Sequence, residues 1–152
     1  NNDPAACYPS AVLGLGATVI TNRREIAADD FFVGMYTTAL DEGEIITAVR
    51  FPIPKRAAYM KFKQPASRFS LVGVFVAQFD AGVRVAVTGA SSCVFRHAGL
   101  EASLSRDFTP QSAAAVAIDA SDLNADLHAS AAYRANLISV QTQRAVAKMT
   151  GA

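Results

Sequence analysis

The feature that most constrains the fold is a long apolar segment that leads through a turn into a second apolar segment. Residues 69–79 (FSLVGVFVAQF) and 83–88 (VRVAVT) are rich in β-branched and aromatic side chains, which favour strands. The three residues between them (DAG) are typical of a hairpin turn. Together with the alternating apolar and polar residues 57–64 (AAYMKFKQ), these segments predict an antiparallel meander.

Helical patterns dominate the rest of the second half. Ser130 precedes a segment in which small and apolar residues recur with 3.6-residue spacing, and this pattern predicts an amphipathic helix over residues 131–149. Thr109 followed by Pro110 is a typical helix start. Residues 97–105 predict one more helix.

Short strands and turns are predicted in the first third. Residues 17–21 (ATVIT) and 25–27 (EIA) predict a hairpin, and residues 44–51 (EIITAVRF) predict a strongly β-branched strand. Pro52 and Pro54 close that strand and mark a boundary. We therefore expect an α+β fold.

Composition excludes several classes of function. The chain has 14 basic and 13 acidic residues without a basic cluster, which argues against nucleic-acid binding. Its longest apolar run, residues 71–77, is too short to span a membrane. Cys7 and Cys93 are too few for a disulfide scaffold, so a reducing, cytoplasmic location is expected. His97 and His128 stand in no metal-ligand motif.

Motifs for self-contained catalysis are also missing. No GxSxG, HExxH, P-loop or complete GxGxxG motif occurs. Residues 14–16 (GLG) precede a predicted strand, whereas a phosphate loop follows one, so we interpret them as a helix end. Because the chain starts without Met or a signal peptide, we expect it to be part of a longer protein.

A series of short segments carries a resemblance that runs through nearly the whole chain. The segments are residues 3–6 (DPAA), 8–11 (YPSA), 29–32 (DDFF), 43–47 (GEIIT), 61–68 (KFKQPASR), 84–90 (RVAVTGA) and 126–130 (DLHAS). In this order they resemble the FAD-binding medium subunit of the carbon monoxide dehydrogenase group, within the xanthine oxidase family of molybdenum hydroxylases.

The resemblance implies two domains. Residues 1–53 would be the C-terminal part of the second FAD-binding subdomain, which is an α/β unit in that family. Residues 56–152 would be the family's C-terminal domain, a small antiparallel sheet with packed helices. The two glycine-rich loops that wrap the FAD diphosphate would lie upstream of Asn1, so the 152-residue chain alone is not expected to bind FAD stoichiometrically.

The resemblance also implies a place in an electron-transfer chain. In the family, substrate is oxidised at a molybdenum cofactor in a large subunit. Electrons then pass through two 2Fe–2S clusters in a small subunit to FAD in the medium subunit, and from there to an acceptor. The expected assembly is a dimer of heterotrimers, with no nucleic acid and no membrane span.

Cofactor-binding residues follow from the resemblance position by position. Cys7 stands where the family commonly has an Asp that contacts the cofactor, and a thiol does not supply the same charged acceptor. Ile46, with its neighbour Ile45, corresponds to the apolar residue that touches the flavin; the alternative is an ordinary core residue. Lys63 corresponds to the lysine that reaches toward the isoalloxazine; the alternative is a solvated lysine on the polar face of a strand. No catalytic or metal-binding residue is predicted.

A second class of function stays open at this point. The chain is also compatible with a non-catalytic module that docks onto iron–sulfur and molybdenum subunits. A yellow, flavin-absorbing preparation of the intact subunit would favour the FAD-binding interpretation.

Overall fold

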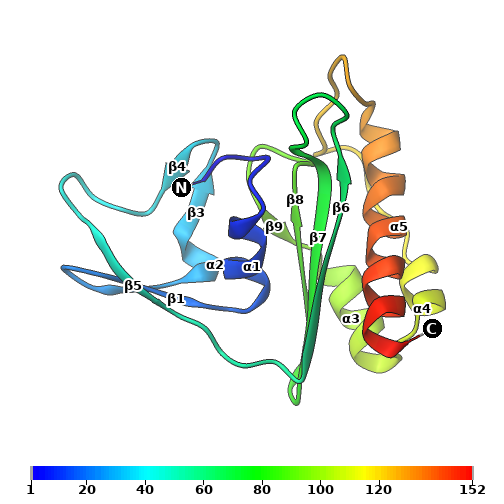
Figure 1. The fold of residues 1–152 in the computed structure, drawn as a ribbon, viewed down its shortest axis with the longest axis horizontal. Helices are drawn as coiled ribbons and strands as arrows, with labels where there is room; N and C mark the ends of the chain where they lie inside the picture. The colour runs from blue at the N-terminus through cyan, green and yellow to red at the C-terminus, as the bar shows by residue number, and fades with distance from the viewer. Residues whose placement is uncertain (1, 152) are drawn as a thin grey trace.

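The computed structural model describes residues 2–151 (Figure 1). The helices are α1 (Tyr8–Gly14), α2 (Ala28–Phe31), α3 (Ala98–Arg106), α4 (Pro110–Ala114) and α5 (Ala131–Thr150). The strands are β1 (Thr18–Thr21), β2 (Glu25–Ala27), β3 (Phe32–Gly34), β4 (Thr37–Thr38), β5 (Ile46–Arg50), β6 (Arg56–Lys63), β7 (Ser70–Phe79), β8 (Gly82–Thr88) and β9 (Phe95–Arg96). The α+β prediction is confirmed.

A four-stranded antiparallel sheet, in the order β6-β7-β8-β9, is the centre of the fold. The predicted hairpin is its middle pair, and Gly82 at the turn has a φ of 140°, which a side chain would strain. One face of the sheet packs against α5, with α3 and α4 completing that side (Figure 1). The largest core cluster lies between the sheet and these helices, and includes Val72, Val74, Val85, Leu100 and Ile138.

The opposite face of this sheet is covered by α1 (Figure 1). Leu13 and Ala17 from the first part of the chain share a buried cluster with Ala86 and Val94 from the second. Beyond α1 lie a three-stranded sheet, β2-β1-β5, and the small β3-β4 pair. The domain boundaries at residues 53 and 56 stay a prediction, since the two parts share this apolar contact.

The helix starts agree with the capping signals in the sequence. The side chains of His97, Thr109 and Ser130 each accept a hydrogen bond from a backbone N–H in the first turn of α3, α4 and α5. His97 therefore caps α3, whereas the sequence prediction placed it inside the helix, over residues 97–105. No helix within residues 2–151 is long and apolar enough to cross a membrane.

Strand β6 follows the predicted alternation up to its last residue. Met60 and Phe62 pack against the core under α5, so Tyr59 and Lys61 lie on the other face, toward α1. The register with β7 then shifts, because Phe62 pairs with Val72 but Lys63 pairs with Ser70. Leu71 is the extra residue, and the bulge ends the regular ladder.

Candidate functional site

A thiol cluster forms where the segment before α1 meets strands β6 and β7. Lys61 Nζ lies 3.3 Å from Cys7 Sγ and donates to it. Ser70 Oγ lies 3.5 Å from the same sulfur and 2.9 Å from the Tyr59 hydroxyl. Residues from three separate segments therefore meet around one sulfur. We call Cys7, Tyr59, Lys61 and Ser70 the thiol cluster.

The end of β8 holds the Cys7 segment in place. Thr88 Oγ1 donates to the carbonyl oxygens of Pro4 (3.0 Å) and Ala6 (2.8 Å). The N–H of Gly89 donates to the Pro4 oxygen at 2.7 Å. Gly89 has a φ of 83°, and a Cβ there would lie 2.8 Å from the Leu71 carbonyl oxygen. Only glycine therefore allows this close approach.

The surroundings of Cys7 lower the pKa of its thiol. Burial alone would raise the pKa of the Cys7 thiol, but hydrogen bonds from Tyr59, Ser70 and Lys61 and the positive charge of Lys61 lower it, and the net pKa is below that of an ordinary cysteine. Burial and the neighbouring sulfur raise the pKa of Tyr59, which stays protonated. When ionised, this thiol carries a negative charge at the position where the resemblance implies an Asp.

This arrangement predicts a low titration midpoint for Cys7. In a Cys93→Ala background, the rate of iodoacetamide alkylation should rise with a midpoint below about 8.5, the value of an unperturbed thiol. Lys61→Met should move the midpoint up, because the thiolate loses its cation. Equal midpoints in the two proteins would contradict the assigned role of Lys61. Lys148→Met, on exposed α5 surface, is the matched control.

The other predicted site residues lie around the same segment, with one exception. Ile46 lines a groove of about 180 Å³ together with Ala6 and Tyr8, the two neighbours of Cys7. Lys63 pairs with Ser70 across the sheet, which places it on the same face as the thiol cluster. Ile45 is 65% exposed and lies outside this groove, at the turn where its N–H donates to Asn22.

Sequence reasoning missed Tyr59, Lys61 and Ser70 as site residues. The alternation of residues 57–64 already put Lys61 on the same face as Lys63, so a signal was present for it. Ser70 had no such signal, because its contact with Cys7 joins residues 63 positions apart.

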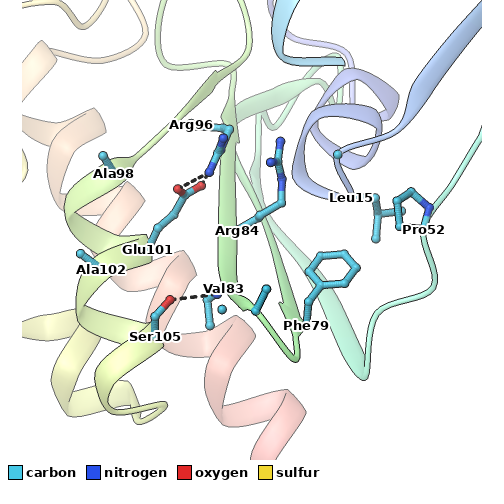
Figure 2. Close-up of a pocket in the computed structure, with 13 residues that line it drawn as sticks. Leu15, Pro52, Phe79, Val83, Arg84, Arg96, Ala98, Glu101, Ala102 and Ser105 are labelled. Atoms are coloured by element: carbon cyan, nitrogen blue, oxygen red, sulfur yellow. Dashed lines mark hydrogen bonds and ion pairs between the residues drawn. The ribbon is translucent and has the colours of Figure 1, made fainter. Parts of the chain in front are cut away.

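A separate and larger cleft of about 620 Å³ lies at the other end of the sheet (Figure 2). Helix α3 lines one side of it, and Leu15 and Pro52 line the other (Figure 2). The hairpin residues Phe79 and Val83 lie between these two sides.

Two arginines and two carboxylates form an ion-pair network beside this cleft. Arg84 Nη2 donates to the Leu13 carbonyl (2.8 Å) and to both oxygens of Asp29 (2.8 and 3.0 Å). Arg96 bridges Asp29 and Glu101. The Arg84 side chain thereby fixes the end of α1 to strand β8. Within residues 2–151, no group of three or more His, Cys, Asp or Glu side chains is placed to hold a metal ion.

Comparisons with known proteins point to one group. Residues 1–54 match the family described as FAD binding domain in molybdopterin dehydrogenase. The nicotine 6-hydroxylase medium subunit of Paenarthrobacter nicotinovorans is 34% identical over 160 residues, covering 96% of this chain and 56% of the relative. The carbon monoxide dehydrogenase medium chain of Hydrogenophaga pseudoflava is 30% identical over 136 residues, covering 82% of this chain and 47% of the relative.

Solved structures share the fold. Quinoline 2-oxidoreductase from Pseudomonas putida 86 superposes with a TM-score of 0.82 at 24% identity, covering 98% of this chain and 57% of that one. Reconstituted CO dehydrogenase from Oligotropha carboxidovorans superposes with a TM-score of 0.82 at 23% identity, covering 98% of this chain and 58% of that one. The chain spans about half the length of the curated relatives it matches.

Proposed function

We propose that this chain, which belongs to the family of FAD-binding medium subunits of molybdenum hydroxylases, forms one side of a flavin site that relays electrons from iron–sulfur clusters to an acceptor. The observation that carries the proposal is the meeting of Cys7 with Lys61 and Ser70, beside the Ile46 groove. FAD, when bound, supplies the redox chemistry, and the chain's residues bind and orient it.

The residues present fit one side of a flavin. An isoalloxazine ring needs apolar contacts on its faces and polar groups at its edge. The Tyr8 side chain is 87% exposed and Ile46 is 38% exposed, so apolar surface is available beside the thiol cluster. Lys63 is also exposed, and among residues 2–151 its ammonium has no hydrogen-bond or ion-pair partner.

Each polar residue then has a role in binding. The free Lys63 ammonium stabilises negative charge that develops on the ring edge. Lys61 instead donates to Cys7 Sγ, so the two lysines of β6 have different partners. Ser70, hydrogen-bonded to Tyr59, fixes the thiol position.

The wider assembly is part of the same proposal. By the family's organisation, a large subunit with the molybdenum cofactor and a small subunit with 2Fe–2S clusters are the partners, in a dimer of heterotrimers. A cytoplasmic location fits the two free cysteines, Cys7 and Cys93.

Lys63→Ala tests the flavin-side role in the intact subunit. The reduction potential of bound FAD should fall, because the reduced anion loses its cation, while the free energy of unfolding should change by no more than about 0.5 kcal/mol. Potentiometric titration of the yellow protein measures the reduction potential, and urea denaturation measures the free energy of unfolding.

Lys148→Ala, an exposed lysine on α5 across the sheet, is the control and should leave the potential unchanged. If the potential and the FAD affinity of Lys63→Ala equal those of the natural protein, Lys63 is a solvated surface lysine. A colourless intact subunit would instead favour a docking module without flavin.

A further inference from the structure

The cleft in Figure 2 has the size and lining of a small-molecule site. Its volume of about 620 Å³ falls within the range of ligand pockets, roughly 300–1,000 Å³. Its walls are mainly apolar, and they are provided by Leu15, Pro52, Phe79, Val83, Ala98 and Ala102. The Phe79 ring lies between the α3 side and the Pro52 side (Figure 2), and it offers a flat apolar surface to a ligand.

Small residues keep the cleft open. Ala98, Ala102 and Ser105 lie three and four positions apart on α3, so they share the face that lines the cleft. Gly82, opposite them, has no side chain, and a Cβ there would come within 3.1 Å of Ser105 Oγ. Larger residues on either side would close the space.

The polar group in the cleft lining that can still form a hydrogen bond is a donor, the Arg84 guanidinium. Arg84 lines the cleft, but its bonds to Leu13 and Asp29 all use Nη2. Its Nε is buried and closed to a ligand. Its Nη1 has no acceptor among residues 2–151, so Nη1 is the donor that stays available. Glu101, the carboxylate in the lining, is already occupied: it accepts from Val85 N–H and from two nitrogens of Arg96.

We propose that this cleft binds a small planar aromatic compound that carries a carboxylate. The ring would lie against Phe79 and the alanine face of α3, and the carboxylate would accept from Arg84 Nη1, the guanidinium nitrogen that neither Asp29 nor Leu13 uses. Guanidinium–carboxylate hydrogen bonds are charge-assisted and favoured by the planar shape of both groups.

The site is distinct from the flavin side proposed above. The thiol cluster contacts Ser70 at the start of β7, whereas the cleft is lined by Phe79 at its end. Ten residues of extended strand separate the two by about 30 Å. FAD should therefore not compete for the cleft, so the two proposals can fail independently.

Titration with 2-naphthoate, followed by amide ¹H–¹⁵N chemical shifts of the 152-residue protein, tests the proposal. Shifts are expected at Val83, Ala98 and Ala102, with saturation, and 2-naphthalenemethanol should bind more weakly because it has no carboxylate. Ala102→Phe fills the cleft and should weaken 2-naphthoate binding about tenfold or more. Ala114→Phe, on the exposed surface of α4 outside the cleft, is the matched control.

Arg84→Lys keeps the positive charge beside Asp29 but removes the guanidinium, so it should reduce the preference for 2-naphthoate over the alcohol. Circular dichroism confirms that each variant is folded. Three results would overturn the proposal: no saturable shift at the cleft, equal binding of acid and alcohol to the natural chain, or equal weakening by Ala102→Phe and Ala114→Phe.

Discussion

Replacing Arg134 with leucine is expected to lower the free energy of unfolding by about 2–5 kcal/mol. The Arg134 residue is only 3% exposed, and its guanidinium binds three groups that belong to different parts of the fold. Nη1 donates to the carbonyl oxygens of Leu71 (2.8 Å) and Gly89 (2.9 Å), and Nη2 donates to Asp126 at 2.7 Å.

The size of this effect follows from the bulge at the start of β7. Leu71 is the extra residue of the bulge and has no pairing partner in β6. Its carbonyl oxygen accepts a hydrogen bond from the Arg134 side chain instead. Leucine fills part of the volume but donates no hydrogen bond, which leaves two buried carbonyls unsatisfied. Because Gly89 also holds Pro4, the change should loosen the segment that carries Cys7.

Urea denaturation measures the loss, and Arg144→Leu is the matched control. Arg144 is exposed on the same helix, α5, so its replacement should change the free energy of unfolding by less than about 0.5 kcal/mol. A similar, small change for both variants would show that Arg134 contributes no more than a surface arginine.

The sequence predicts the parts of the fold that rest on local patterns. The hairpin at residues 80–82, the amphipathic helix after Ser130 and the core face of Met60 and Phe62 all follow from periodicity and turn chemistry. The bulge at Leu71 does not, because a register shift depends on a partner strand and on the side chain of Arg134.

The candidate site is likewise predictable from the sequence only in part. The resemblance selects Cys7, Ile46 and Lys63, and their role in binding FAD stays a prediction. In the structure, the two neighbours of Cys7 line the groove with Ile46, and Lys63 pairs with Ser70 of the thiol cluster. The resemblance does not indicate that Lys61 is the lysine in contact with Cys7, since that contact joins residues 54 positions apart. Likewise, the cleft beside Arg84 depends on how α3 packs beside β8, and no local pattern encodes it.

Glu44→Gln is expected to destabilise the protein at neutral pH and to remove part of its sensitivity to acid. The Glu44 residue is 7% exposed. Its carboxylate accepts from Arg24 Nε (3.0 Å) and Nη2 (2.9 Å), from the Asp41 N–H (2.9 Å) and from the Thr21 hydroxyl (2.7 Å). A neutral amide cannot satisfy all of these donors.

The direction of the pH dependence follows from the pKa. The Arg24 guanidinium, then the Asp41 N–H and the Thr21 hydroxyl, lower the pKa of Glu44 to about 2, against about 4.3 for an unperturbed glutamate. A lowered pKa in the folded state means that the stabilisation is complete above about pH 4.3 and is lost as the pH falls toward 2.

The difference in unfolding free energy between the natural protein and Glu44→Gln should therefore be largest at neutral pH and shrink steadily below about pH 4.3. Chemical denaturation across this range measures it, and Glu42→Gln, an exposed neighbour in the same turn, serves as the control. A difference that does not change with pH would refute the ionised role of Glu44. Since Glu44 directly precedes Ile45 and Ile46, the loss should also loosen the start of β5, where the Ile46 groove begins.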